Sequence, residues 1–276
     1  MKLRSLLLIA LVAVVFCGCH SYQPTSITVA SYNLRNANGS DSAKGNGWGQ
    51  RYPVIAKMVQ YHDFDIFGTQ ECFIHQLKDM KEALPGYDYI GVGRDDGKEK
   101  GEHSAIFYRT DKFDVIEKGD FWLSETPDVP SKGWDAVLPR ICSWGHFKCK
   151  DTGFEFLFFN LHMDHIGKKA RVESAYLVQD KMKELGKGKE LPAILTGDFN
   201  VDQTHQSYDA FVSKGVLCDS YEKCDFRYAT HGTFNDFDPD SFTESRIDHV
   251  FVSPVFKVKR YGVLTDTYRS IRGNGG

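Results

Sequence analysis

The sequence predicts an α/β fold built as one domain. Short apolar runs rich in β-branched and aromatic residues alternate with segments whose apolar residues recur at helical spacing, in both halves of the chain. The 276 residues are 41% hydrophobic and 26% charged, which is ordinary for a folded protein. Because no repeat, low-complexity run or linker divides residues 25–276, we expect a single α/β domain over that range.

The first half of the chain predicts two strands, each followed by a helix. Residues 27–33 form the first strand, and a loop rich in Gly and Asn follows at residues 36–49. A helix is expected to start near Pro53, with one face formed by Ile55, Met58, Val59 and His62. Residues 65–71 form the second strand, and the helix after it has one side formed by Phe73, Leu77, Met80 and Leu84.

The second half predicts mostly strands, with one long helix. Short strands are expected near residues 87–91, 105–108 and 113–116. Residues 140–150 and 154–161 flank Asp151-Thr152-Gly153 and predict a hairpin. Residues 168–185 predict a helix whose inner side is formed by Val172, Ala175, Val178, Met182 and Leu185. The last two strands are expected over residues 193–195 and 249–253.

The N-terminal residues 1–19 have the pattern of an export signal. Lys2 and Arg4 precede an apolar stretch, residues 6–16, that is too short to span a bilayer comfortably. Residues 16–19, with the sequence FCGC, are similar to a loose lipobox in which Cys19 would be lipidated. We therefore predict an exported, periplasmic protein that contacts the membrane only through a lipid anchor at Cys19. The alternative is ordinary signal cleavage with free export.

The remaining cysteines do not form a metal cluster by their spacing. Two of the seven lie in the export signal, and the odd number left, five, requires at least one free thiol. Cys142 and Cys149 fall on one predicted strand at an odd separation, so they should face opposite sides and not pair. Cys218 and Cys224 flank a short polar loop and form the one plausible disulfide, which the sequence leaves open. Cys72 is expected to be a buried apolar residue.

The charge balance favours a small substrate. The formal net charge is −3, whereas non-specific binding to nucleic acid relies on clustered Lys and Arg that displace counterions. A small phosphorylated molecule fits this balance better than long duplex DNA, although a local basic groove can exist in a neutral protein.

Five predicted strands have polar side chains at one end. Gly197-Asp198-Phe199-Asn200 follows an apolar run, and the other four strand ends carry Asn33, Glu71, His162 and Asp248. Strand ends that converge at one rim are how α/β folds build sites. Carboxylate and amide oxygens are the ligands that Mg²⁺ prefers. The sequence therefore predicts a polar, cation-binding site at one edge of the sheets.

The order of these motifs resembles that of the endonuclease/exonuclease/phosphatase superfamily of DNase I-like proteins. The resemblance covers roughly residues 25–253, and its motifs are Ser31-Tyr32-Asn33, Gln70-Glu71, Asn160-Leu161-His162-Met163-Asp164, Gly197-Asp198-Phe199-Asn200 and Arg246-Ile247-Asp248. Residues 91–97, 121–127 and 133–140 are most similar to secreted bacterial members related to the deadenylase-like branch. The resemblance implies a four-layer α/β/β/α sandwich.

The resemblance also implies roles for these side chains. Glu71, with Asn33 beside it, would bind Mg²⁺ or Mn²⁺. Asp198 would orient or deprotonate the attacking water, and Asn200 would contact phosphate or metal. His162 would contact the phosphate, and Asp248 would orient a basic histidine.

Arginines and tryptophans near the motifs have two interpretations each. Arg35, Arg94 and Arg140 could bind a second phosphate or a substrate carboxylate, or they could be surface ion-pair residues. We take Arg35 and Arg140 as the candidate substrate contacts. Core packing is the expected role of Trp122, Trp134 and Trp144, although each could stack on a base or a sugar.

The chain departs from the family pattern at its C-terminal end. The last motif of the family is Ser-Asp-His, whose histidine is the base, and the sequence stops at Arg272-Gly273-Asn274-Gly275-Gly276 where that motif would be due. We expect a truncated chain that lacks the last strand, with catalytic loss in a full-length chain as the alternative. Because that strand pairs within the sheet of the first strand, we also expect lower stability and a greater tendency to aggregate.

The sequence as a whole predicts a monomeric, divalent-metal-dependent phosphoester hydrolase that acts on a small phosphorylated metabolite, sugar or nucleotide. One alternative is a secreted nuclease, which a basic groove would favour over a narrow pocket lined by Arg and Trp. The other alternative is a non-catalytic protein that binds a phosphate ligand, as loss of the base histidine would favour.

Overall fold

The computed structural model describes residues 26–186, 190–236 and 241–267. The predicted export signal with Cys19 lies outside these residues, as do residues 272–276, so the expectations about both ends stay predictions. Within the described residues, no helix is long and apolar enough to cross a membrane.

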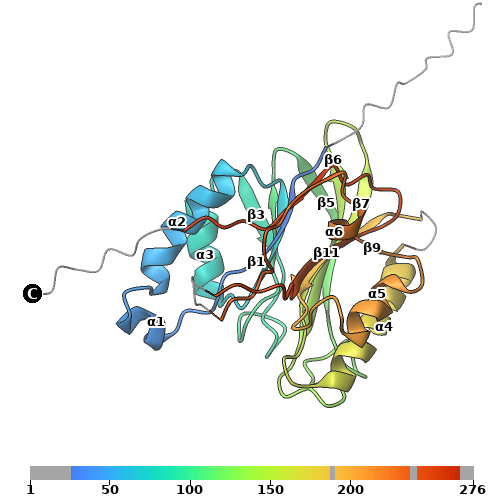
Figure 1. The fold of residues 1–276 in the computed structure, drawn as a ribbon, viewed down its shortest axis with the longest axis horizontal. Coiled ribbons are helices and arrows are strands. Elements are labelled where there is room, and N and C mark those ends of the chain that lie inside the picture. The colour runs from blue at the N-terminus through green and yellow to red at the C-terminus, as the bar shows by residue number, and fades with distance from the viewer. Residues whose placement is uncertain (1–25, 187–189, 237–240, 268–276) are drawn as a thin grey trace, which may run out of the picture.

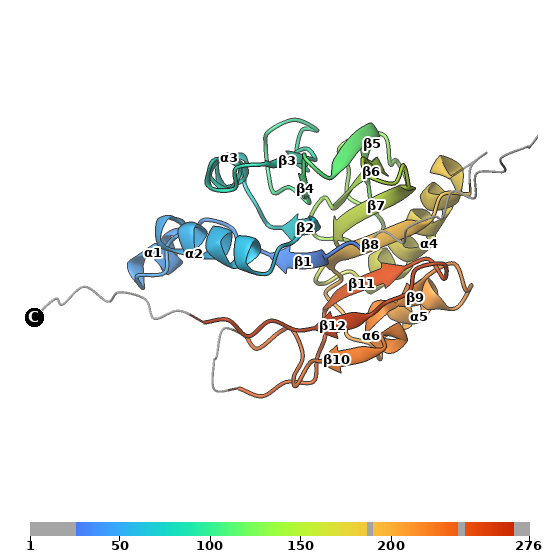
Figure 2. The same ribbon diagram turned by 90° about the horizontal axis from the view of Figure 1, so that it is seen from above.

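Two sheets form the centre of the molecule (Figures 1 and 2). The four-stranded sheet has, in spatial order, β1 (Val29–Asn33), β2 (Ile66–Gln70), β4 (Ile106–Arg109) and β3 (Tyr87–Ile90). The six-stranded sheet has β5 (Phe113–Trp122), β6 (Ile141–Cys149), β7 (Glu155–His162), β8 (Ala193–Asp198), β11 (Asp248–Val252) and β9 (Cys218–Asp219). A separate parallel pair is formed by β10 (Phe226–Tyr228) and β12 (Arg260–Gly262).

Helices cover the outer face of each large sheet (Figure 1). On the four-stranded side lie α1 (Gly39–Ala43), α2 (Trp48–Tyr61) and α3 (Ile74–Ala83). On the six-stranded side lie α4 (Lys168–Leu185), α5 (Gln206–Val212) and the short α6 (Ser220–Lys223). Separate apolar clusters fill each helix–sheet interface, and a third fills the space between the sheets. The predicted four-layer α/β/β/α arrangement is therefore confirmed.

Several predicted elements differ in extent from the structure. The helix expected near Pro53 begins at Trp48, whose ring stacks on Tyr52 at 5.7 Å, and the preceding loop contains α1. The strand predicted over residues 113–116 continues to Trp122. A register shift between Val115 and Glu117 interrupts its alternation, which is why the sequence pattern stopped there. Within the described residues, β1 pairs with β2 alone.

The cysteines behave as the spacing predicted, with no disulfide among the described residues. Cys142 packs in the cluster under the helices, whereas Cys149 packs between the sheets, so the two thiols lie on opposite faces of β6. Cys218 and Cys224 are both free thiols in this structure. Complete burial raises the pKa of the Cys72 thiol to about 12, so it is an unreactive core residue.

A buried amide connects the two sheets just behind the polar strand ends. Asn160 on β7 is fully buried, and its Nδ2 donates to the carbonyls of Thr69 at 2.8 Å and Ala105 at 3.0 Å. Its Oδ1 accepts from Gln70 Nε2 at 2.7 Å and from Thr196 Oγ1 at 3.0 Å. Because each partner group is buried, losing this side chain would leave several of them unsatisfied. Asn160 therefore holds β2 and β4 of one sheet to β7 and β8 of the other.

Gly68 makes room for this amide. A Cβ atom at Gly68 would lie 2.2 Å from Asn160 Oδ1 and 2.3 Å from Thr196 Oγ1, which is too close for any side chain. The glycine in β2 is thus required by the close approach of the two sheets at this point.

His249 is a buried histidine on β11. It follows Asp248 directly, so the two side chains lie on opposite faces of this strand. His249 is 1% exposed, its Nε2 donates to the Val201 carbonyl at 3.1 Å, and its Nδ1 lies 3.5 Å from Arg246 Nη1. Arg246 is itself buried and pairs with Asp219 at 3.1 Å. Burial lowers the pKa of His249 to about 4, against the opposing influence of the Val201 carbonyl and Asp219.

We expect His249 to make stability depend on pH. Between pH 6.5 and pH 4 the unfolded chain would protonate this imidazole while the folded chain would not, so the free energy of unfolding falls as the pH falls. The shift in pKa corresponds to a loss of about 3 kcal/mol, complete near pH 4. Urea unfolding measures the free energy of unfolding at pH 7 and at pH 4. The fall between these two pH values should be smaller in His249→Gln than in the wild type, by about 2–3 kcal/mol. An equal pH difference in both proteins would contradict the assignment.

Candidate active site at the strand ends

Strand pairing brings the predicted site residues to one edge of the two sheets. β1 runs parallel to β2, which places Asn33 beside Gln70 and next to Glu71. In the other sheet, β7 runs parallel to β8 with His162 beside Asp198, and β11 pairs with β8 with Asp248 opposite Asp198. Side chains from five strands therefore meet, and the two sheets contribute different members.

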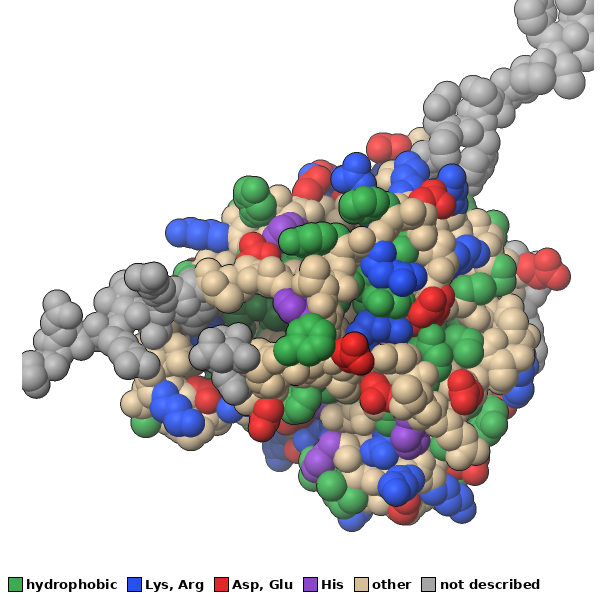
Figure 3. Space-filling view, viewed as in Figure 1, with side chains coloured by type: hydrophobic (Ala, Val, Ile, Leu, Met, Phe, Trp, Pro, Cys, Tyr) green, Lys and Arg blue, Asp and Glu red, His purple; other side chains and the backbone are tan. Residues whose placement is uncertain are grey.

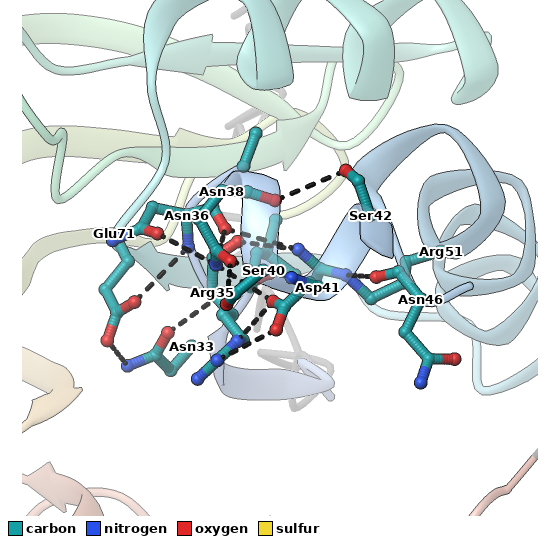
Figure 4. A network of polar contacts seen from close by, with 12 residues as sticks. Asn33, Arg35, Asn36, Asn38, Ser40, Asp41, Ser42, Asn46, Arg51 and Glu71 are labelled. Atoms are coloured by element: carbon teal, nitrogen blue, oxygen red, sulfur yellow. Dashed lines mark hydrogen bonds and ion pairs between the residues drawn. The ribbon is translucent and has the colours of Figure 1, made fainter. Parts of the chain in front are cut away.

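Asn33 joins the two carboxylates of the site. Its Nδ2 donates to Glu71 Oε1 at 2.9 Å and to Asp198 Oδ2 at 3.0 Å. Its Oδ1 accepts from the Arg35 backbone N–H at 2.9 Å, and the Asn36 N–H donates to Glu71 Oε2 at 3.2 Å (Figure 4). The Asn33 oxygen is therefore occupied in this arrangement, and a cation could use it only if the amide turned over. As placed here, Asn33 positions Glu71 and Asp198.

Three residues of the site have left-handed backbone conformations. Arg35 has φ 54°, Glu71 has φ 66° and Asn200 has φ 52°. Each lies one or two residues beyond the end of a strand that leads to the site. Such conformations cost about 1–3 kcal/mol per residue and persist where surrounding contacts fix them. The chain therefore bends sharply just after each strand and directs the polar side chains to one place.

His162 is a neutral imidazole beside Asp198. Asn200 Nδ2 donates to His162 Nε2 at 3.0 Å and to the Met163 carbonyl at 2.8 Å, which assigns the ring proton to Nδ1. His162 Nε2 lies 3.7 Å from Asp198 Oδ2. Burial, helped by the positive charges of Arg140 and Arg94, lowers the pKa of His162 well below its usual value.

Asp198 is a buried carboxyl group that interacts with the half-buried carboxyl group of Asp248. Burial raises the pKa of Asp198 to about 6, although hydrogen bonds from Asn33 and from the Asn200 N–H at 2.9 Å oppose that rise. Burial, and then the neighbouring Asp198, raise the pKa of Asp248 well above its usual value. Because Asp248 lies opposite Asp198 in the pairing of β8 with β11, the two carboxyl groups do not ionise independently. The Thr233 hydroxyl accepts from the Asp248 N–H at 3.1 Å and so fixes the start of β11.

The donor set fits a divalent cation. One ligand atom from each of Glu71, His162 and Asp198 can be chosen so that all lie within 4.8 Å of one another. Two of the three are carboxylates, which suit hard cations such as Mg²⁺ and Mn²⁺. The unpaired negative charge that Glu71 and Asp198 would otherwise place together is a further reason for a cation here.

A small recess adjoins these residues. It is a shallow recess lined by Glu71, Arg94, Glu102, His103, Ser104, Arg140, Ile141 and His162. Arg140 is 4% exposed, and its Nε lies 3.4 Å from Asp164 Oδ2. Arg140 Nη1 is buried with no hydrogen-bond partner among the described residues. A buried guanidinium with a free donor is suited to bind an oxyanion in the recess.

The side chain of Arg35 binds Asp41 and not the recess. Its guanidinium binds Asp41 of α1 with two hydrogen bonds, of 2.5 and 3.0 Å (Figure 4), and it does not line the recess. This pairing matches the ion-pair interpretation of Arg35, whereas Arg140 pairs with Asp164 and also lines the recess. Trp122 and Trp144 are buried, as core packing requires.

Several residues that line or support the site lie outside the sequence motifs. Glu102, His103 and Ser104 line the recess, and Asn36 and Thr233 support Glu71 and Asp248. The pattern that could have indicated the first three is the short polar run Gly101-Glu102-His103-Ser104 directly before the apolar β4. Asn36 and Thr233 act through their backbone or hydroxyl groups, for which the sequence carries no comparable pattern.

Comparison with known proteins agrees with the observed fold. The family model described as Endonuclease/Exonuclease/phosphatase family matches residues 30–267. A crystal structure of an endonuclease/exonuclease/phosphatase family protein from Bacteroides thetaiotaomicron is 92% identical, with a TM-score of 0.90, and the match covers 91% of this chain and 90% of that one. A mannosyl-6-phosphatase of Bacteroides thetaiotaomicron VPI-5482 is 91% identical, with a TM-score of 0.88, over 90% of this chain and 92% of that chain.

The chain matches only part of the length of the curated relatives. Two mimivirus proteins and a Ccr4 3'-5'-exoribonuclease subunit of Phaeosphaeria nodorum match, and the chain spans 60%, 38% and 47% of their lengths. The Ccr4 subunit is 23% identical over 82% of this chain, in keeping with the predicted relation to the deadenylase-like branch. The chain belongs to the endonuclease/exonuclease/phosphatase family and is an enzyme of the phosphatase and phosphodiesterase class.

Proposed function

We propose that the protein is a divalent-metal-dependent phosphatase that removes phosphate from a phosphorylated sugar. The observation that carries this proposal is the meeting of Glu71, Asp198 and His162 at the mouth of a small recess that contains the buried guanidinium of Arg140. The high similarity to a mannosyl-6-phosphatase supports a sugar monoester as the substrate.

The residues divide the work of phosphoester hydrolysis between them. Glu71 would hold the cation, with Asn33 keeping Glu71 in position. When bound, the cation would neutralise the charge that develops on the phosphoryl oxygens. Asp198 would take the proton of the attacking water, for which a pKa raised to about 6 by burial is suitable.

The neighbouring donors would fix the phosphoryl group. Arg140 would bind a phosphoryl oxygen through its free Nη1, since Asp164 already holds its Nε. His162 Nε2 accepts from Asn200 Nδ2 at 3.0 Å, so these two side chains would hold each other in place beside the phosphate rather than donate to it. Donors that are fixed before the substrate arrives need no reorganisation during the reaction, which makes them effective in the transition state.

Surface charge favours a small monoester over a polynucleotide. The face shown in Figure 3 has acidic and basic side chains interspersed, without a continuous basic stripe. A nucleic-acid groove would instead present clustered Lys and Arg along the path of the backbone.

Phosphate release from matched substrates tests the proposal. We expect release from mannose 6-phosphate in the presence of Mg²⁺ or Mn²⁺, loss of that activity in EDTA, and slower cleavage of a dinucleotide phosphodiester. Faster cleavage of the diester or of single-stranded DNA would favour the nuclease alternative. Metal-dependent phosphate binding without turnover on any substrate would favour the non-catalytic alternative.

A further inference from the structure

The loop between β3 and β4 forms a wall of the recess that the phosphate-binding residues do not explain. This loop, residues 91–103, carries Arg94, Glu102 and His103 to the recess. It is tightly folded, because the Arg94 N–H donates to the Glu102 carbonyl at 3.1 Å and the Asp95 N–H to the Lys100 carbonyl at 3.1 Å. The loop is therefore a fixed part of the site.

Trp122 anchors the loop to the end of β5. Its Nε1 donates to the Arg94 carbonyl at 2.7 Å. The loop turns over this indole ring at Gly97, which has φ 67° and where a Cβ atom would lie 3.0 Å from the ring. The tryptophan thus fixes the backbone of Arg94, which helps to hold its side chain in one place beside Arg140.

Arg94 and Glu102 form an ion pair within the recess. Arg94 Nη1 lies 2.7 Å from Glu102 Oε2, and the two side chains are 12% and 15% exposed. Arg94 Nε is buried without a hydrogen-bond partner among the described residues, with Asp95 Oδ1 at 4.0 Å. A buried donor without a partner is costly, so a ligand that supplies an acceptor there would be favoured.

The charge of this pair selects the kind of ligand group. Because Glu102 already neutralises Arg94, a second phosphate bound here would face a carboxylate at close range. A hydroxyl group both accepts from a guanidinium and donates to a carboxylate, so adjacent hydroxyls match the pair. We propose that Arg94 and Glu102 are specificity-determining residues that bind the hydroxyl groups of the sugar leaving group, an inference that rests on the phosphatase function proposed above.

The inference is tested by the selectivity of Glu102→Gln. The measurement is the ratio of kcat/KM for mannose 6-phosphate to kcat/KM for p-nitrophenyl phosphate, whose leaving group has no sugar hydroxyls. A hydrogen bond to a charged group is worth about 1.5–3 kcal/mol, so the ratio should fall by about ten- to hundredfold. Arg94→Lys, which keeps the charge but loses the planar fork of donors, should lower the ratio in the same direction.

Glu99→Gln is the matched control. Glu99 lies on the same loop, but it is exposed and pairs with Lys78 at 3.2 Å, outside the recess. Its substitution removes the same charge and should leave the ratio at the wild-type value. Mg²⁺ titration of Glu102→Gln by calorimetry checks the metal site, because Asn36 contacts both Glu102 at 3.3 Å and Glu71 at 3.2 Å.

Each other outcome has a definite meaning. An unchanged ratio, or an equal loss on both substrates, would overturn the role of Glu102 in selectivity while leaving the phosphatase function intact. A wild-type protein that hydrolyses neither monoester with Mg²⁺ or Mn²⁺ would instead overturn the proposed function itself.

Discussion

Glu71→Gln is expected to abolish most of the metal-dependent activity. Glu71 is the carboxylate that Asn33 and the Asn36 N–H hold at the edge of the four-stranded sheet, at 2.9 and 3.2 Å. Loss of its charge should weaken Mg²⁺ binding by at least about a hundredfold, because even residues that only support a metal ligand contribute ten- to hundredfold. Removing several kcal/mol of transition-state stabilisation should lower kcat/KM by roughly a hundred- to thousandfold.

Calorimetry with Mg²⁺ and phosphate-release kinetics measure the two effects. Glutamine is the better substitution here, since it keeps the size and the left-handed backbone position of Glu71, φ 66°, with the least change in packing. Glu82→Gln, an exposed change on α3, is the control for loss of one negative charge. Equal Mg²⁺ affinity in Glu71→Gln and the wild type would remove Glu71 from the metal site.

Asp198→Asn should have the largest effect on the chemical step. Asparagine keeps one oxygen that can accept from the Asn200 N–H, but its amide nitrogen cannot accept from Asn33 Nδ2, and the side chain cannot take the proton of the attacking water. Loss of a general base lowers the rate by about 10²–10⁴-fold. Because burial already disfavours the charged form of Asp198, the substitution should not lower the free energy of unfolding. The effect should therefore appear in kcat in a protein that remains folded.

Steady-state kinetics and urea unfolding of the same preparation separate these quantities. Asp202→Asn is a suitable control, because Asp202 lies four residues beyond Asp198 and binds the Thr204 N–H at 2.9 Å and hydroxyl at 2.6 Å, away from the carboxylate cluster. A kcat for Asp198→Asn within threefold of the wild-type value would assign proton removal to another group.

Local sequence patterns predicted those parts of the fold that local physics determines. The helix over residues 168–185 was predicted with its observed ends, because its inward residues recur at helical spacing and glycines flank it at Gly167 and Gly186. The hairpin around residues 151–153 and the polar strand ends were predicted for similar reasons. Parallel pairing then placed His162 beside Asp198 without further information.

Contacts between distant residues could not be predicted in this way. Whether an arginine faces solvent, an acidic neighbour or a recess depends on tertiary partners. Arg35 and Arg140 both pair with an aspartate, but of the two only Arg140 lines the recess. The role of Glu102 depends on a loop that folds back on itself so that residues eight positions apart pair. The orientation of the Asn33 amide follows from the Arg35 backbone N–H, which no composition or spacing specifies.

The amide of Asn160 fixes the relative position of the two sheets, and the geometry of the site depends on that position. Glu71 and Asn33 belong to one sheet, whereas His162, Asp198 and Asp248 belong to the other, so the catalytic group is complete only while the two sheets stay in register. A small displacement of one sheet along the other would separate these side chains and abolish activity, although every helix and strand remained intact. Conversely, a cation or phosphate bound to residues of both sheets would hold the sheets together. Its binding free energy would then add to the stability of the folded protein.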